Sequence, residues 1–296
     1  MPHYAFLDGP YRLAMGLRAL DLQDWIEVGP DFGHQMALRN RLLALRQGEV
    51  FAGLPESAAG QQEVLELLLD HLTKRFPSLY ERADGALRVA GEPVRSDPQA
   101  PLLAVGRMVQ EDFCLMQKGP SGYRLVAAVL CFPLHWRLAD KLGRPLDAIH
   151  EPVPDFGARL AGTVERFFAS LQVSRPAWRV NWSLIDTPEL FRPPEDRTRP
   201  RRIDAAHAGE QLWLRVERQT LRRLPRCGDV LFGIRSHVEP LAEVTAAPAV
   251  AQALAARVRE MPDAMARYKS IAGIRQPLLA YLDRRAAGDP GKISAS

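Results

Sequence analysis

The chain has 296 residues, of which 47% are hydrophobic and 25% charged, the balance expected of a soluble globular protein with a sizeable core. Its formal net charge is only +4, which does not indicate a nucleic-acid-binding protein, because such a protein needs a concentrated basic face. The three cysteines form no C-x-x-C pair, so neither a zinc site nor an iron–sulfur cluster has its usual ligand spacing. The sequence also lacks a nucleophile elbow, a P-loop and a G-x-G-x-x-G motif.

The N-terminus and the apolar segments predict the compartment. "MPHYAFLDGPYRLAMGL" carries an acid and prolines where a signal peptide has a continuous apolar run. No segment approaches the roughly 18 apolar residues of a membrane span. Cys114 and Cys131 lie inside apolar runs, as buried thiols do in a reducing compartment. We therefore expect a cytoplasmic protein without a membrane segment.

The first half of the chain changes from helical to strand periodicity. "DFGHQMALRNRLLALRQG" (31–48) and "QQEVLELLLDHLTKRFP" (61–77) have apolar residues at helical spacing and end at a glycine and a proline. "EDFCLMQKGPSGYRLVAAVLCFP" (111–133) has two apolar runs around a Gly-Pro-Ser-Gly turn and predicts a β-hairpin. Its second run, 125–132, is apolar on both faces, as in a central strand.

The second half predicts one long helix, three strands and a helical end. "ARLAGTVERFFASLQ" (158–172) has one apolar helical stripe. "WRVNWSL" (178–184), "LWLRVER" (212–218) and "DVLFGIRSHV" (229–238) have strand character, although the third alternates less regularly. The last 50 residues return to helix before a polar tail. "RPPEDRTRPRRID" (192–204) predicts a long loop between strands.

This order of elements predicts an α+β fold with a mostly antiparallel sheet of about five strands around a long helix, and added N- and C-terminal helices. We expect a single domain over residues 1–285, followed by a disordered C-terminal tail at 286–296. No internal repeat divides the chain.

His150 is the most conspicuous candidate for chemistry. It lies in "KLGRPLDAIHEPVPDF", and Pro152 and Pro154 stiffen the backbone that follows it. One interpretation is an ordinary histidine whose ring nitrogens bind nearby backbone groups. The other is a ligand to a metal or to haem iron, because such a ligand needs a neutral imidazole held in one orientation. The residue pattern leaves both open.

A second candidate is the strand "LRVERQTLRRLP". Strand alternation places Arg215 and Glu217 on the same face, where they form either an ordinary solvated ion pair or a polar wall for a ligand. Arg179 and Asn181 extend this wall if their strand is a neighbour. Glu111 and Asp112 are adjacent and point to opposite faces of a strand, so we expect capping or strand-edge solubility rather than a shared acid–base pair.

Several motifs together resemble the haem-dependent oxidative N-demethylase-like proteins, a family formerly described as a domain of unknown function. They occur in family order from about residue 5 to residue 285. The motifs are "DGPYRLAMGLRALDLQDWIEV", "QEDFCLM", "CFPLHWRLADKLGRPLDAIHEPVPDF", "NWSLIDTPELFRP" and "LRVERQTLRRLPRCGDVLFGIRSHVEPL".

The resemblance implies a PAS-like antiparallel sheet that binds haem b. It also implies a monooxygenase reaction in which dioxygen is used to remove a methyl group from a small secondary amine such as dimethylamine, releasing formaldehyde. The sequence has no flavin, nicotinamide or iron–sulfur motif, so the electrons must come from a separate flavin- or iron–sulfur-containing reductase. The alternative is a PAS-like haem sensor or gas-binding module without turnover.

The resemblance also assigns site residues. His150 is the expected axial ligand of the haem iron, because it is the histidine of the most distinctive motif, and His135 is its competitor. Glu217 is the expected catalytic residue and would hold a protonated amine. The residues expected to contact haem are His150, Arg215, Arg218, Trp182 and Asn181. We expect the two arginines to pair with the propionates, although Arg218 and Glu217 have opposite strand parity and cannot both face the haem.

Overall fold

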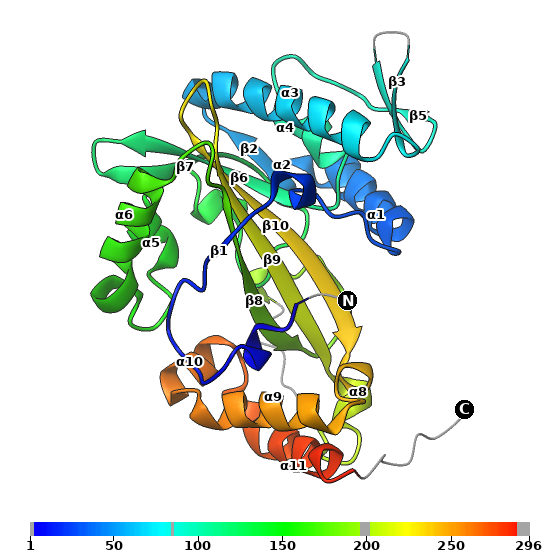
Figure 1. Cartoon of the computed structure of the whole chain (residues 1–296), viewed down its shortest axis with the longest axis vertical. Helices are drawn as coiled ribbons and strands as arrows, with labels where there is room; N and C mark the ends of the chain where they lie inside the picture. Colours follow the sequence, from blue (N-terminus) through cyan, green and yellow to red (C-terminus); the bar gives the residue numbers. More distant parts are fainter. Residues whose placement is uncertain (1–2, 84–85, 196–201, 289–296) are drawn as a thin grey trace.

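A seven-stranded antiparallel sheet forms the centre of the molecule in the computed structural model, which describes residues 3–83, 86–195 and 202–288 (Figure 1). A small three-stranded antiparallel sheet lies at one end. The strands of the large sheet, in spatial order, are β1 (Arg18–Ala19), β8 (Ala177–Ile185), β9 (Trp213–Arg223), β10 (Val230–Pro240), β6 (Asp112–Gly119), β7 (Gly122–Val129) and β2 (Phe51–Gly53). The small sheet contains β3 (Tyr80–Ala83), β4 (Ala86–Val89) and β5 (Glu92–Pro93).

The predicted α+β class and antiparallel pairing are confirmed. The predicted hairpin is β6–β7, and the three later strands are β8, β9 and β10. The large sheet has seven strands rather than five because β1 and β2 also pair with it. These two strands have two and three residues, too few for an alternating pattern to be visible in the sequence.

Strand β7 is next to the sheet edge and not central, which corrects the interpretation of its apolar run. The short β2 pairs with part of its outer side, and an isolated bridge joins Arg124 of β7 to Pro145. The run is apolar on both faces because Val126 and Val129 belong to one core cluster, whereas Leu125 and Ala128 belong to another on the opposite face. A strand buried on both faces therefore does not have to be central.

Helices cover both ends and one side of the sheet (Figure 1). The N-terminal helices lie at one end of the long strands, the C-terminal helices lie at the other, and α5 and α6 lie beside the sheet. The α-helices are α1 (Phe32–Leu45), α2 (Gln47–Val50), α3 (Ala58–Arg75), α4 (Pro101–Gly106), α5 (Leu146–His150), α6 (Ala161–Ser170), α7 (Ala208–Gln211), α8 (Leu241–Val244), α9 (Pro248–Glu260), α10 (Asp263–Tyr268) and α11 (Arg275–Ala286).

The predicted long helix at 158–172 is α6, preceded by the π-helical turn Phe156–Leu160. Asp155, directly before the turn, has φ 61°, a left-handed conformation that a non-glycine residue adopts only when its surroundings hold it. The chain therefore changes direction sharply between His150 and α6. This segment brings α5 against the side of the sheet.

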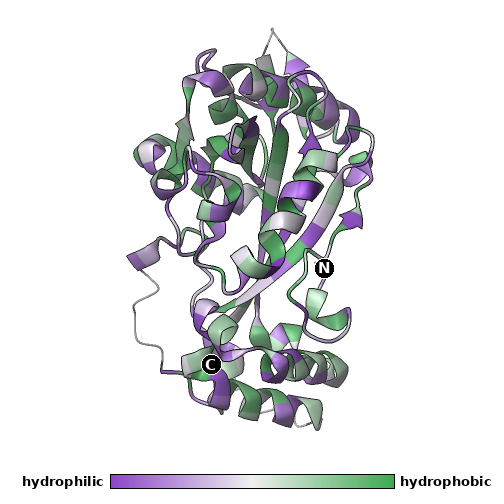
Figure 2. Ribbon diagram, turned by 90° about the vertical axis from the view of Figure 1, so that its left-hand side faces the viewer, coloured by the Kyte–Doolittle hydropathy of each residue, from purple (hydrophilic) through white to green (hydrophobic). Residues whose placement is uncertain are grey.

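Three hydrophobic clusters fill the interior, one for each group of helices. The first packs the N-terminal helices against β6 and β7, the second packs the C-terminal helices against β8 and β9, and the third packs α5 and α6 against β6, β7 and β9. Figure 2 shows hydrophobic residues along the long central strands, where these clusters meet. The sheet is consequently buried on both faces over much of its length.

Two other predictions fall partly outside the described residues. The predicted tail begins at residue 286, where α11 ends, but residues 289–296 are not described. The same holds for residues 196–201 of the predicted long loop. Within the described ranges, no helix combines the length and apolarity needed to cross a membrane.

Candidate functional site

The register of β8 and β9 divides the predicted site residues between two faces of the sheet. Asn181 is opposite Glu217, and Ser183 is opposite Arg215, so these four side chains share a face. This face is also covered by α5 and α6, because Leu221, which has the same parity as Glu217, packs with them in one core cluster.

His150 ends α5 and has a fixed orientation. Its Nδ1 lies 2.8 Å from the carbonyl oxygen of Leu146, and its ring stacks on Phe156 with 4.5 Å between centroids. A carbonyl only accepts, so Nδ1 carries the proton and Nε2 keeps its lone pair. Loss of water lowers the pKa of His150, which favours the neutral ring at pH 7. This is the state that an iron ligand requires.

Glu217 is the carboxylate at the centre of the shared face. Its Oε1 lies 3.3 Å from Nε of Arg215, and its Oε2 accepts a hydrogen bond from Gln219 at 3.1 Å. Its side chain is 13% exposed, so a small ligand can reach it. The charge of Glu217 also acts on Arg179 and on Lys269, a residue from the segment after α10.

Lys269 reaches this face past the part of β8 that the two-residue β1 does not pair with. Its Nζ donates to Oδ1 of Asn181 at 3.0 Å and to the carbonyl oxygen of Trp182. Loss of water lowers the pKa of Lys269 to about 8; Glu217 opposes this shift and Arg179 adds to it. No pattern in the sequence singles out Lys269, because it is an isolated lysine in "ARYKSIAG", about 50 residues from the nearest predicted site residue.

The side chain of Arg215 is fully buried and bound to the protein itself. Its Nη1 donates to the carbonyl oxygen of Leu190 at 3.0 Å, and its Nη2 donates to the carbonyl oxygen of Phe132 and to Oγ of Ser236. It therefore ties two loops to the sheet. With these acceptors in place, its planar fork is not free for a bidentate contact with a carboxylate.

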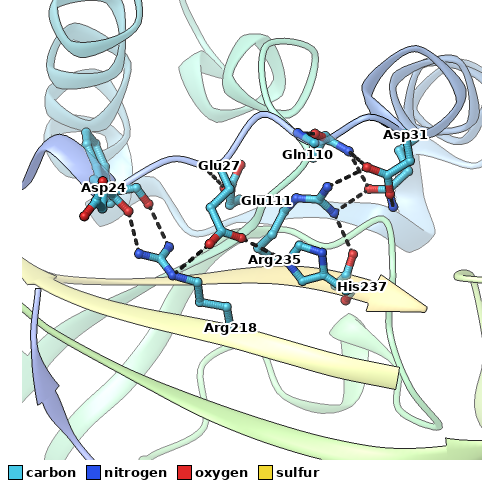
Figure 3. A network of polar contacts seen from close by, with 12 residues as sticks. Asp24, Glu27, Asp31, Gln110, Glu111, Arg218, Arg235 and His237 are labelled. Carbon is cyan, nitrogen blue, oxygen red and sulfur yellow. Dashed lines mark hydrogen bonds and ion pairs between the residues drawn. The ribbon is translucent and has the colours of Figure 1, made fainter. Parts of the chain in front are cut away.

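Arg218 points to the opposite face of β9 (Figure 3). It donates to the carbonyl oxygens of Asp24 and Trp25, and its Nε lies 3.2 Å from Oε1 of Glu27. His237 of β10 is 2.9 Å from the other carboxylate oxygen of Glu27. This network fastens the N-terminal segment to the sheet, away from His150.

Trp182 is also separated from the His150 face. Trp182 is buried in the cluster of the C-terminal helices, with Nζ of Lys269 5.3 Å from its ring centroid. His135 has φ 61°, and its backbone N–H donates to the carbonyl oxygen of Arg192 at 2.7 Å. Of the five residues expected to contact haem, the register places Asn181 and Arg215 on one face and Arg218 and Trp182 on the other. His150 lies at the end of α5, which packs on the face of Asn181 and Arg215.

The prediction of strand-edge solubility for Glu111 and Asp112 was wrong, although both carboxylates cap backbone N–H groups, as the alternative predicted. Both are about 1% exposed, because β6 is an interior strand. Asp112 forms an ion pair of 2.6 Å with Arg39 and accepts hydrogen bonds from the backbone N–H groups of Cys131 and Phe132. These contacts hold the end of β7 rather than a strand edge.

A cavity of about 410 Å³ lies next to the segments that carry His150 and Lys269. Pro154 and Asp155, just after α5, line one wall, and Pro262 and Met265, just before Lys269, line another. The N-terminal residues 11–14, together with Arg159 and Ala264, complete the lining.

The pKa of Lys269 predicts a pH-dependent effect on stability. Between about pH 8 and the ordinary value of 10.5, the unfolded chain holds the lysine proton and the folded protein does not, so this group makes stability rise with pH. Below pH 8 the lysine is protonated in both the folded and the unfolded state, and the full cost of burying its charge lowers the free energy of unfolding. We expect Lys269→Met to raise the free energy of unfolding at pH 7 and to remove this rise.

Urea denaturation at pH 7 to 10 measures the effect, with the exposed Lys118→Met as the control. A Lys269→Met protein that is less stable than the wild type at pH 7 would show that the charged amine is well paired in the folded state.

One comparison with known proteins bears on this site. The family model described as "Haem-dependent oxidative N-demethylase, alpha subunit-like" matches residues 16–279, which is most of the chain. The matched range includes His150, Glu217 and Lys269. The chain belongs to the haem-dependent oxidative N-demethylase alpha subunit-like family.

Proposed function

We propose that the chain binds haem b and catalyses the oxygen-dependent removal of a methyl group from a small secondary amine, releasing formaldehyde. The observation that carries this proposal is the geometry of His150. Its Nδ1–H is held by the Leu146 carbonyl, so Nε2 is left for iron. The family match supports a haem-dependent oxidative N-demethylase reaction.

The order of the five long strands supports the PAS-like fold that the proposal includes. In space they run β8-β9-β10-β6-β7, which is third, fourth, fifth, first and second in chain order, and α6 lies between the second and third in the chain. This permuted order, in which the last three strands of the chain precede the first two, is our argument for a PAS-like sheet. The resulting face, with helices beside it, is where we place the haem.

The residues present fit haem as the bound group. A neutral imidazole with a fixed tautomer suits the iron, and the buried Nε of Arg179, which has no hydrogen-bond partner among the described residues, suits an anionic group on the same side. Bound haem supplies the binding and activation of dioxygen. His150 orients the group through its ring, which is clamped between Leu146 and Phe156.

Glu217 acts on the amine. A secondary amine is protonated at neutral pH, and a carboxylate in a partly dry site binds such a cation by a charge-assisted hydrogen bond. Glu217 is the only acidic side chain that the described parts of β8, β9 and β10 place on the shared face. It holds the N–H group of the amine and fixes the orientation of the methyl group toward the haem.

The electrons come from a separate reductase. The sequence has no flavin, nicotinamide or iron–sulfur motif, and the family name describes an alpha subunit, which fits an enzyme with further subunits.

The direct test is turnover. The haem-loaded protein is supplied with dimethylamine, dioxygen and an artificial electron donor, and formaldehyde is measured. Formaldehyde formed in proportion to the amine consumed supports the proposal. Haem binding without formaldehyde, with either the donor or a cell-derived reductase fraction, would favour a haem sensor on the same fold.

We predict that Glu217→Gln lowers kcat/KM for the amine by about 100-fold, because the charged acceptor for the ammonium group is lost. The Soret band should stay in place, since Glu217 does not bind the iron. Steady-state kinetics and an absorption spectrum check both points.

Glu92→Gln, on the exposed surface of the small sheet, is the control and should keep full activity. A Glu217→Gln enzyme with unchanged kcat/KM would exclude Glu217 from amine binding.

A further inference from the structure

Three acidic side chains near the shared face each form an ion pair with an arginine. The pairs are Asp112 with Arg39 at 2.6 Å, Asp186 with Arg192 at 3.0 Å, and Glu217 with Arg215 at 3.3 Å. The charges of Asp112, Arg192 and Glu217 all act on Arg215, so the three pairs lie in one neighbourhood. Two cations of the same neighbourhood, Arg179 and Lys269, remain outside these pairs.

Arg179 is held on the shared face by β8. Its Cα partner on β9 is Gln219, which has the same parity as Glu217. Nε of Arg179 is buried and has no hydrogen-bond partner within the described part of the chain. Loss of water lowers the pKa of Arg179, and Glu217 is the one charge that opposes this shift. A buried donor of a charged group without an acceptor is costly, and an anion would supply that acceptor.

Lys269 has hydrogen-bond acceptors but no anion within bonding distance among the described residues. Its Nζ binds an amide oxygen and a backbone carbonyl, and both are neutral. The charges of Arg179 and Glu217 act on Lys269 with opposite signs. Glu217 already faces Arg215, so the neighbourhood carries two more positive charges than negative ones when all groups are ionised.

Haem b carries two propionate carboxylates, which match these two cations in number and sign. The register of β8 places Arg179 on the face that α5 and α6 cover, and the charges of Lys141 and Arg179 both act on His150 at the end of α5. We propose that Arg179 and Lys269 bind the haem propionates. This inference rests on the proposed function, and it replaces Arg215 and Arg218, whose guanidinium groups bind backbone carbonyls of this chain.

The experiment compares haem with haem dimethyl ester, in which both propionates are esterified and uncharged. Each is titrated into the apoprotein, and the Soret band gives Kd. The wild type should bind haem at least about 10-fold more tightly than the ester. Arg179→Gln and Lys269→Gln should each weaken haem binding by about 10–100-fold, the effect of one lost charge-assisted contact, and leave ester binding unchanged.

Arg166→Gln, on the exposed face of α6, is the matched control and should change neither Kd. Arg179→Lys keeps the positive charge and should recover part of the haem affinity, which separates a propionate contact from a loss of folding. Thermal unfolding of each apoprotein checks that the variants fold.

The outcomes separate this inference from the proposed function. Equal losses of haem and ester binding in the variants, or a wild type that does not discriminate the two, would overturn the propionate assignment while leaving His150-dependent haem binding intact. A wild type that binds neither porphyrin would overturn both.

Discussion

His150→Ala is expected to weaken haem binding by about 100-fold or more and to abolish the Soret band of a histidine-ligated haem. The reason is that the variant removes a neutral imidazole whose Nδ1 is held by the Leu146 carbonyl and whose Nε2 lone pair is left for iron. Groups that merely orient a metal ligand already contribute about 10–100-fold in metal affinity, so losing the ligand itself should cost at least as much. Absorption spectra during haem titration measure both quantities.

Three comparisons make this test specific. His34→Ala, on the exposed surface of α1, should leave the spectrum unchanged. Added imidazole should restore the band in His150→Ala by occupying the space of the missing ring. His135→Ala should bind haem as the wild type does. If instead His135→Ala loses the band and His150→Ala keeps it, the ligand is His135, and the site must be placed near the loop after β7.

Asp112→Asn is expected to lower the free energy of unfolding by about 3–5 kcal/mol, because it leaves the guanidinium of Arg39 buried without its counter-charge. The carboxylate of Asp112 has two acceptor oxygens, one for the backbone N–H of Cys131 and one for that of Phe132. The asparagine side chain has one acceptor oxygen, so one of these N–H groups also loses its partner. Urea denaturation, monitored by circular dichroism, measures the difference.

The matched control is Asp70→Asn. Asp70 pairs with Lys74 at 2.6 Å on the exposed face of α3, and a surface pair of this kind contributes about 0–1 kcal/mol. A loss of stability in Asp112→Asn no larger than in Asp70→Asn would contradict a buried ion pair at this position. The double variant with Arg39→Gln should be less destabilised than the sum of the single variants, because each single change leaves one charge unpaired.

These contacts link the stability of the fold to the candidate site. Asp112 fixes the backbone N–H of Phe132, and Arg215 binds the carbonyl oxygen of the same residue. Arg215 in turn holds Glu217 on the shared face. The motifs around residues 112, 132 and 215 are far apart in sequence, yet they form one buried assembly behind the candidate site.

The local hydrophobic pattern of the sequence was sufficient to predict the long strands and helices. The hairpin at 111–133 and the strands that became β8, β9 and β10 are visible in the sequence, because burial of one or both faces imposes a period on a strand. The same reasoning could not find β1 and β2, whose pairing is decided by neighbouring strands and not by their own few residues. The same reasoning predicted that β7 is a central strand because its residues are apolar on both faces. Helices cover the faces of β7 in the structure, and such burial leaves the same apolar pattern in a strand near the edge.

The sequence by itself also determined the most informative candidate, His150, because prolines and a distinctive motif mark it within one short segment. Parity along β9 separated Glu217 from Arg218 before the fold was known, since side chains of a strand alternate between two faces. Only the tertiary structure decided which parity faces α5, that Arg215 binds backbone carbonyls, and that Lys269 reaches Asn181 from a distant segment. The physical reason is that periodicity reports only local geometry, whereas a charged side chain's partners are set by the packing of segments that are remote in the chain.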